Sequence, residues 1–379
     1  MDFKLSSEHL MARTLFSEFA QNEVKPYAAE VDETEQFPKG TVEKLERYGF
    51  MGIPIPREFG GQGCDSLTYV MCVEELSKCC ATTGVIVSAH TSLCCDPILK
   101  FGTPAQKDEF LKPLASGEKL GAFALTEPGA GTDAAGVQTK AVLEGEEYVL
   151  NGSKIFITNG KEADIYIIFA LTNPALGTKG MSAFIVEKGT PGFTFGTKEK
   201  KMGIRGSSTY ELIFRDCRIP RENMLGQEGK GFSIAMATLD GGRIGIAAQA
   251  LGIAEGALEA TVAYVKQRKQ FGRAIAQFQN TQFTLADLAA KVEAAKLLVY
   301  KAAYAKDTQK RFSVEAAMAK LFAAETAMEV TTKCVQLHGG YGYTREYAVE
   351  RMMRDAKITE IYEGTSEVQR MVISGSLLN

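Results

Sequence analysis

Glu363 carries the carboxylate whose setting most needs an explanation. It lies in the stretch KITEIYEGTSEVQR, residues 357–370, between Tyr362 and the pair Gly364–Thr365. Both flanks have the composition of helices, so the glycine beside the glutamate requires a reason. Because positioned carboxylates transfer protons in many enzymes, Glu363 is the first candidate for chemistry.

Glycine-rich stretches are the second kind of candidate. They are FALTEPGAGTD at 123–133, LDGGRIG at 239–245, RKQFGR at 268–273 and QLHGGYGY at 336–343. Each stretch alone fits a helix cap or a tight turn at least as well as a binding site. Their meaning therefore depends on how they occur together.

The common nucleotide, metal and hydrolase motifs do not occur. Lys161 and Lys230 follow glycines but precede neither serine nor threonine, so there is no Walker loop for phosphate. The glycines at 129–136 have the wrong spacing for a dinucleotide fingerprint and precede strands instead of a helix. There is also no His-Glu-x-x-His and no Gly-x-Ser-x-Gly. A Rossmann-type NAD enzyme, a zinc enzyme of that type and a serine hydrolase are therefore disfavoured.

The eight cysteines favour free thiols over a metal centre. Cys72, Cys79, Cys80, Cys94 and Cys95 fall in one region with a helical pattern, but no Cys-x-x-Cys occurs and the three histidines are far apart in sequence. Zinc or iron–sulfur ligation is therefore disfavoured, and no metal is expected. Free thiols indicate a reducing, cytoplasmic location.

The charge balance gives no sign of a polyanionic partner. The chain has 43 Lys and Arg against 46 Asp and Glu, for a formal net charge of −3. Such a balance provides no electrostatic footprint for nucleic acid or an anionic membrane. Neither a signal-peptide pattern nor an apolar stretch of membrane-spanning length is found. We therefore expect neither nucleic acid nor a membrane as a partner.

Three regions of different composition must position these candidates. Residues 1–120 have the pattern of helices interrupted by loops such as IPIPREFGGQG at 53–63, where prolines and glycines stop a helix. Residues 121–225 contain short runs rich in β-branched and aromatic residues, such as EEYVLNGSKIFITNG, DIYIIFALT and SAFIVEK. Strands with no helix between them predict an antiparallel sandwich or barrel.

Residues 226–379 lack proline and predict long antiparallel helices. Apolar residues recur there at spacings of three and four, the period of helices that bury one face in a bundle. The two series are Leu285, Leu288, Val292, Ala295 and Val299, and Val314, Ala317, Leu321, Ala324 and Met328. The predicted fold is therefore mainly α-helical with a central β domain.

Taken together and in this order, the glycine-rich stretches and the Tyr-Glu-Gly-Thr segment resemble the acyl-CoA dehydrogenase family over essentially the full chain. The resemblance extends to its short-chain branch, most of all to the butyryl-CoA dehydrogenases of anaerobic bacteria such as clostridia. It implies an N-terminal helical domain, a middle β-barrel or sandwich domain and a C-terminal four-helix bundle. It also implies FAD as the cofactor, bound between the β domain and the bundle.

The resemblance assigns FAD contacts motif by motif. Many relatives carry tryptophan where this chain has Phe156, which puts the ring stacking at this position in question. Arg268 and Gln279 are expected to reach the FAD of a neighbouring subunit, where the arginine fork suits a pyrophosphate, so a homotetramer built as a dimer of dimers is implied. The full set is Phe123, Leu125, Thr126, Gly131, Thr132, Phe156, Thr158, Arg268, Phe271, Gln279, Gln336, Gly339, Gly340, Thr365 and Glu367.

The resemblance makes Glu363 the catalytic base. The family's glutamate removes the proton α to the thioester while a hydride leaves the β carbon for the flavin. A free glutamate titrates near pH ~4.3, so burial beside Tyr362 and the acyl chain is expected to raise its pKa. Glu360 is the competing carboxylate, and would share a helical face with Glu363 if the helix continued. Some relatives carry the base at the position of Gly242, which cannot act as one.

Substrate contacts follow from the same motifs. The thioester carbonyl is expected to accept hydrogen bonds from a flavin ribityl hydroxyl and from the backbone N–H of the base. Arg243 suits the anionic or carbonyl groups of the CoA-bearing substrate. The implied substrate contacts are Thr132, Asp240, Arg243, Tyr362 and Gly364.

The implied activity is FAD-dependent dehydrogenation of butyryl-CoA to crotonyl-CoA, or the reverse reduction, by an oxidoreductase that acts on a CH–CH bond. Its electron partner is expected to be an electron-transferring flavoprotein, with coupling to electron bifurcation as one option in anaerobes. The run KEKK at 198–201 could dock that partner, although a solvated loop is favoured. The alternatives are an acyl-CoA oxidase, a branched- or medium-chain dehydrogenase and, from another class, a non-catalytic binding protein.

Overall fold

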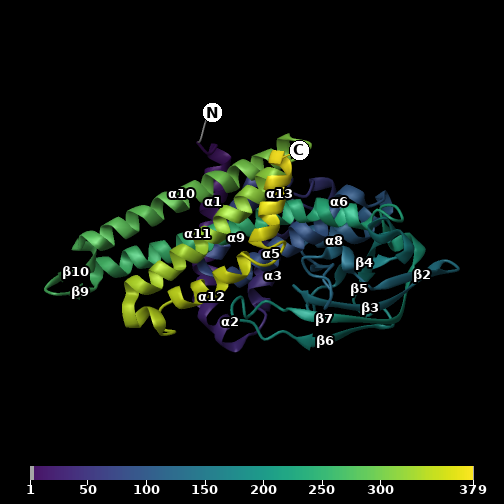
Figure 1. Ribbon diagram of the computed structural model, residues 1–379, viewed down its shortest axis with the longest axis horizontal. Helices are drawn as coiled ribbons and strands as arrows, with labels where there is room; N and C mark the ends of the chain where they lie inside the picture. The colour runs from purple at the N-terminus through teal and green to yellow at the C-terminus, as the bar shows by residue number, and fades with distance from the viewer. Residues whose placement is uncertain (1–3, 379) are drawn as a thin grey trace.

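The computed structural model describes residues 4–378, and its elements follow the predicted order of helices, strands and long helices (Figure 1). The segment 53–63 interrupts the N-terminal helices, as its prolines and glycines predict. The N-terminal helices are α1 (Ser7–Phe19), α2 (Ala28–Thr34), α3 (Lys39–Arg47), α4 (Ser66–Cys79), α5 (Ala81–Ser88), α6 (Asp96–Phe101), α7 (Pro104–Gln106) and α8 (Lys112–Ser116).

The middle of the chain forms one eight-stranded sheet. Its order is β6-β7-β3-β2-β4-β5-β8, with β1 paired to β4. Most pairings are antiparallel, as predicted, but β1 runs parallel to β4 and β2 meets β4 in parallel at one residue pair. The β2–β3 hairpin lies between β1 and β4 in the chain, and so long a connection can join parallel strands. The strands are β1 (Gly121–Ala124), β2 (Lys140–Glu144), β3 (Glu147–Ile157), β4 (Ile165–Leu171), β5 (Met181–Glu187), β6 (Phe193–Lys198), β7 (Tyr210–Pro220) and β8 (Met224–Leu225).

Strand β4 is buried along its whole length because both of its faces are covered. On one face, Tyr166 and Ile168 pack within the sheet domain with Phe184 and Phe214 from other strands. On the other face, Ile165, Ile167 and Phe169 pack with residues of the helical segments, among them Ile98 of α6 and Leu114 of α8. The sheet is thereby fixed against the helices, as a strand buried on both faces requires.

The C-terminal part consists of long helices, with α13 packed against α11. In α10 the predicted apolar series is buried except for the partly exposed Leu285. In α11 the prediction is confirmed in part, because Ala317 and Ala324 are buried, whereas Val314, Leu321 and Met328 keep partial exposure. The elements are α9 (Gly231–Gln267), the hairpin strands β9 (Lys269–Gln270) and β10 (Arg273–Ala274), α10 (Gln279–Thr308), α11 (Ser313–His338), α12 (Val349–Thr359) and α13 (Ser366–Leu378).

One hydrophobic core joins the N-terminal helices to the C-terminal bundle. It includes Val70 and Leu76 of α4 together with Ile246 and Leu251 of α9. Figure 1 shows α9 running from the strand region to the far end of the bundle. The division into domains at 1–120, 121–225 and 226–379 remains a prediction.

A close crossing of α4 and α9 depends on glycine. A Cβ on Gly252 would lie 2.2 Å from the carbonyl oxygen of Glu74, and one on Gly256 would lie 2.4 Å from that of Lys78. Only glycine permits such an approach of two backbones.

Within the described part of the chain, no helix has the length and apolarity needed to cross a membrane.

Candidate active site

Glu363 lies on a turn between two helices. Helix α12 ends at Thr359 and α13 begins at Ser366. Glu363 and Gly364 have φ angles of 53° and 94°. Glycine adopts this left-handed region freely, whereas a glutamate there costs about 1 to 3 kcal/mol. A Cβ on Gly364 would also lie 2.8 Å from Nε2 of Gln369, so the glycine of the motif is what permits the turn.

The competing carboxylate points to a different partner. Because α12 stops at Thr359, Glu360 and Glu363 do not share a helical face. Glu360 instead accepts a hydrogen bond from the ammonium group of Lys357 at 2.6 Å in an exposed ion pair. Glu363 is therefore the better placed of the two carboxylates for proton transfer.

The carboxylate of Glu363 is enclosed by α9 and the segment before α6. Its Oε2 is buried and has no hydrogen-bond partner among residues 4–378. A Cβ on Gly242 would lie 2.0 Å from this oxygen and 2.7 Å from Cδ2 of Leu93. Burial raises the pKa of Glu363 to about 8, against the opposing charges of Lys320 and Arg243. Such a carboxyl group is suited to exchange protons near neutral pH.

Tyr362, beside Glu363, is anchored by α9. Its hydroxyl donates to Oε1 of Gln249, and Nε2 of Gln249 donates in turn to the carbonyl of Ala81 at 2.9 Å. Burial raises the pKa of Tyr362 well above its usual value, so the phenol stays neutral. Thr365, on the other side of the turn, accepts the N–H of Val368 at 3.3 Å and thereby caps α13.

Side chains from three helices hold the carbonyls of the turn. Nε of Arg243 lies 3.4 Å from the carbonyl oxygen of Glu363, while Gln369 and Lys320 donate to that of Gly364 at 2.9 and 2.6 Å. Arg243 was predicted, but Lys320, Gln369 and Gln249 were not. A lysine on the alanine-rich face of α11 was the one available signal.

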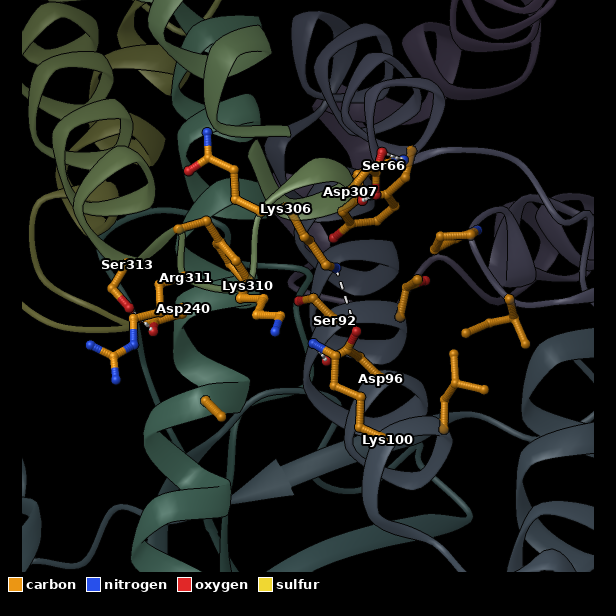
Figure 2. A pocket seen from close by; sticks show the side chains of 18 of the residues that line it. Ser66, Ser92, Asp96, Lys100, Asp240, Lys306, Asp307, Lys310, Arg311 and Ser313 are labelled. Atoms are coloured by element: carbon orange, nitrogen blue, oxygen red, sulfur yellow. Dashed lines mark hydrogen bonds and ion pairs between the residues drawn. The ribbon is translucent and has the colours of Figure 1, made fainter. Parts of the chain in front are cut away.

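A cavity of about 630 Å³ lies between the N-terminal helices and the bundle, and none of the described residues that line it belongs to the turn itself. Tyr69 and Ser92 line it, together with the predicted Asp240 (Figure 2). Asp240 accepts from Arg243 at 2.7 Å and from the hydroxyl of Ser313. Since Arg243 also reaches the carbonyl of Glu363, Asp240 connects the cavity wall to the turn that carries Glu363.

The cavity carries an excess of positive charge. Lys100 and Lys306 pair with Asp96 at 2.8 and 3.5 Å, and Figure 2 shows them on either side of it. Lys310 and Arg311, from the loop between α10 and α11, have no ion-pair partner among the described residues. Unpaired cations at the wall of a cavity favour a ligand with phosphate groups.

A second cavity, of about 550 Å³, collects four predicted cofactor residues: Arg268, Gln336, Gly339 and Gly340. The Arg268 guanidinium stacks over the ring of Tyr341 at 5.1 Å. A Cβ on either glycine would meet no atom within 4 Å, so the backbone there is open to close approach. An open backbone beside a guanidinium fits the pyrophosphate and adenosine parts of FAD.

Two of the predicted flavin residues of the β domain, Thr126 and Phe156, lie close together. The N–H of Ile155 donates to the carbonyl of Thr126 at 2.9 Å, which joins the stretch after β1 to the end of β3. Phe156 has a φ of 60° and an exposed ring, whereas Leu125 is buried. An exposed aromatic face next to loop backbone fits an isoalloxazine ring.

The remaining predicted residues differ in their exposure. Phe123 is half-buried and packs its ring against Phe169 at 5.0 Å, so it belongs partly to the core. Thr132 and Glu367 are exposed, while Thr158 is half-buried. A Cβ on Gly131 would meet no atom within 4 Å.

The hairpin of β9 and β10 projects from the molecule. Phe271 at its tip is 94% exposed and has a φ of 51°. Gln279 begins α10 just after this hairpin and is also exposed. A side chain this exposed is not part of the core of its own chain and is available for contact with another subunit.

Comparisons with known proteins match the whole architecture. Models of the acyl-CoA dehydrogenase N-terminal, middle and C-terminal domains match residues 6–118, 122–217 and 229–378. The short-chain-specific acyl-CoA dehydrogenase of Clostridium acetobutylicum is 62% identical over 377 residues, which cover 100% of both chains.

Solved structures agree with this match. Butyryl-CoA dehydrogenase from Megasphaera elsdenii has a TM-score of 0.99 and 54% identity, with 100% of both chains covered. A structure from work on the electron-transferring flavoprotein of Acidaminococcus fermentans and flavin-based electron bifurcation has a TM-score of 0.99 and 56% identity, again with full coverage. An FAD complex of PigA is 32% identical with a TM-score of 0.95, covering 100% of this chain and 99% of that one. With all three domain models matched in order and such relatives covering it from end to end, the protein belongs to the acyl-CoA dehydrogenase family.

Proposed function

We propose that the protein is a short-chain acyl-CoA dehydrogenase that interconverts butyryl-CoA and crotonyl-CoA with FAD as its cofactor. The observation that carries the proposal is the Glu363 carboxylate, whose Oε2 is buried without a partner among the described residues. The similarity to a short-chain-specific dehydrogenase and to a butyryl-CoA dehydrogenase supports a short acyl chain.

Glu363 takes the proton from the carbon α to the thioester. Bound FAD would supply the acceptor for the hydride that leaves the β carbon. Among residues 4–378, no acceptor is paired with the backbone N–H of Glu363, which leaves this donor for the thioester carbonyl. A fixed N–H at that oxygen stabilises the charge that develops as the α proton leaves.

The cavity shown in Figure 2 takes the CoA part of the substrate. Its volume of about 630 Å³ lies within the range of roughly 300–1,000 Å³ that is usual for ligand sites. Lys310 and Arg311 are available for phosphates because the carboxylates of the cavity have other partners. Asp96 and Asp240 form ion pairs, and Asp307 accepts a hydrogen bond from Ser66. Asp240 and Arg243 fix the wall nearest the turn.

Residues in two places would hold FAD. Phe156 and Thr126, with Gly131, Thr132 and Thr158, supply the surface for the ring system, while the predicted Leu125 packs in the core. Arg268 and the segment 336–340 supply the surface for the pyrophosphate and adenosine. The exposed Phe271 and Gln279 support a cofactor site shared between subunits, and therefore a homotetramer built as a dimer of dimers.

An electron-transferring flavoprotein is the proposed electron partner, supported by the similarity to the A. fermentans structure. A cytoplasmic location is supported by the cysteines, all eight of which lie in the described part of the chain as free thiols.

An anaerobic titration with butyryl-CoA tests the proposal. Substrate should bleach the flavin absorbance of the parent protein and leave that of Glu363→Gln unchanged, although the variant should still bind FAD and acyl-CoA. Glu360→Gln is the matched control, because it removes a partly exposed carboxylate three residues away that is paired with Lys357, and it should bleach like the parent. Bleaching in Glu363→Gln would contradict the assignment of the base.

The same assay decides between the related activities. Rapid peroxide formation in air without an added acceptor would identify an oxidase. Bleaching by a longer or branched thioester, but not by butyryl-CoA, would leave the mechanism intact and overturn the proposed substrate.

A further inference from the structure

Lys320 is a buried lysine with no carboxylate partner. Its side chain is fully buried in α11, and none of the ion pairs among residues 4–378 includes it. Fully buried lysines are rare unless their charge is satisfied. Its ammonium group donates instead to the carbonyl of Gly364 at 2.6 Å. Burial of an ammonium group costs desolvation free energy, so a specific role is expected for this lysine.

The carbonyl that Lys320 binds belongs to the catalytic turn. Gln369 donates to the same oxygen at 2.9 Å from α13. Both contacts depend on the left-handed backbone of Glu363 and Gly364, which directs this carbonyl toward α11 and α13. The two donors therefore restrain the backbone that carries the base.

Lys320 and Gln369 differ in charge. Burial lowers the pKa of Lys320 to about 8, while the nearby Glu363 carboxylate opposes that fall. Conversely, the Lys320 charge is the largest influence that opposes the burial-driven rise in the pKa of Glu363. The other charged or titratable groups that act on this pair are Arg243 from α9, Tyr69 from α4, Glu360 and Tyr362 from the turn, and Glu367 from α13.

We propose that Lys320 is a positioning residue for the base: it fixes the Gly364 carbonyl and supplies the positive charge that keeps Glu363 able to ionise. The inference rests on the proposed function, because it assigns a role relative to the base of that reaction. Lys320 has two effects. It shares with Gln369 the hydrogen bond to the Gly364 carbonyl, but only Lys320 carries a charge.

A matched pair of variants separates these effects. Lys320→Met and Gln369→Met each remove one donor to the Gly364 carbonyl, so both should lower kcat. Only Lys320→Met removes a positive charge beside Glu363. In the pH profile of kcat/KM for butyryl-CoA oxidation, the pKa of the acidic limb should therefore move in this variant alone. We expect it to move upward by about 1 to 3 pH units. An unmoved limb in Lys320→Met, or an equal shift in Gln369→Met, would overturn the proposal.

Lys320→Arg provides the opposite change. Arginine stays charged where the buried lysine begins to lose its proton, so the limb should move to lower pH than in the parent. Thermal melting identifies which variants are folded, and this second variant keeps the proposal testable if Lys320→Met does not fold. A limb at higher pH in folded Lys320→Arg would contradict the proposed role of the charge.

Infrared spectroscopy gives a readout that does not depend on turnover. The protonated Glu363 carboxyl band, identified by its loss in Glu363→Gln, should persist to higher pH in Lys320→Met than in the parent. If Glu363→Gln remains active, the assignment of Glu363 as the base of the proposed function fails. If Glu363→Gln is inactive but the band titrates identically in the parent and Lys320→Met, the role of Lys320 alone fails.

Discussion

At the scale of single residues, the space for the Glu363 carboxylate is made by the absence of a methyl group at position 242. A Cβ on Gly242 would lie 2.0 Å from Oε2 of Glu363. We predict that Gly242→Ala lowers kcat for butyryl-CoA by at least tenfold, because displacement of the base by about 1 Å is enough for a large loss. Stopped-flow measurement of flavin bleaching checks this.

The neighbouring glycine provides the control. A Cβ on Gly241 would lie 3.6 Å from Nζ of Lys306, an ordinary contact. Gly241→Ala should therefore retain most of kcat and gain up to about 1 kcal/mol in stability from helix propensity. Equal kcat losses in the two variants would show that the collision with Glu363 is not the cause.

Sequence reasoning found the residues whose identity is tied to a local motif. Glu363 and Gly364 are neighbours, so their relation is visible in the chain. Lys320 and Gln249 reach the turn from helices far away in sequence, and their contacts arise only from packing. In sequence, the alanines around Lys320 are the one sign that distinguishes it from a solvated lysine on a helix.

At the scale of elements, a buried ion pair ties the loop after β1 to β3. Nζ of Lys154 lies 2.7 Å from Oε1 of Glu127 and 3.1 Å from the carbonyl of Leu125. We predict that Lys154→Met destabilises the protein by about 3 kcal/mol, because it leaves a buried carboxylate without its counter-charge. It should also weaken FAD retention, measured as flavin absorbance after gel filtration.

Lys140→Met is the comparison for that variant. Lys140 is exposed on β2, so its loss should change stability by no more than about 0.5 kcal/mol. Urea unfolding measures both variants. If Lys154→Met were as stable as Lys140→Met and retained as much flavin, the Lys154–Glu127 ion pair would have no role in holding the loop.

Elements were predictable where their packing is one-sided. The series in α10 is mostly buried because that helix presents one face to the bundle. Helix α11 packs against α9, α10, α12 and α13, so alanines such as Ala316, Ala319 and Ala323 occupy its tightest contacts. A single apolar stripe includes Ala317 and Ala324 but misses the alanines on the other faces of a helix that is packed on several sides.

At the scale of the whole molecule, the crossing of α4 and α9 joins the two helical regions. We predict that Gly252→Ala costs about 1 to 3 kcal/mol, because its Cβ would collide with the carbonyl of Glu74. The loss should appear as one lower thermal transition, since the N-terminal helices and the bundle share a core. Gly40→Ala, whose Cβ would meet no atom within 4 Å, should leave Tm nearly unchanged.

The raised pKa of Glu363 also has a consequence for the direction of the reaction. With a pKa of about 8, the carboxyl group is mostly protonated at pH 7 and mostly ionised above pH 8. Saturated acyl-CoA requires the ionised form, whereas an enoyl-CoA that is being reduced must receive a proton at its α carbon. The two directions should therefore show mirror-image pH profiles that cross near pH 8, and at neutral pH the resting protein already holds the proton that enoyl reduction consumes.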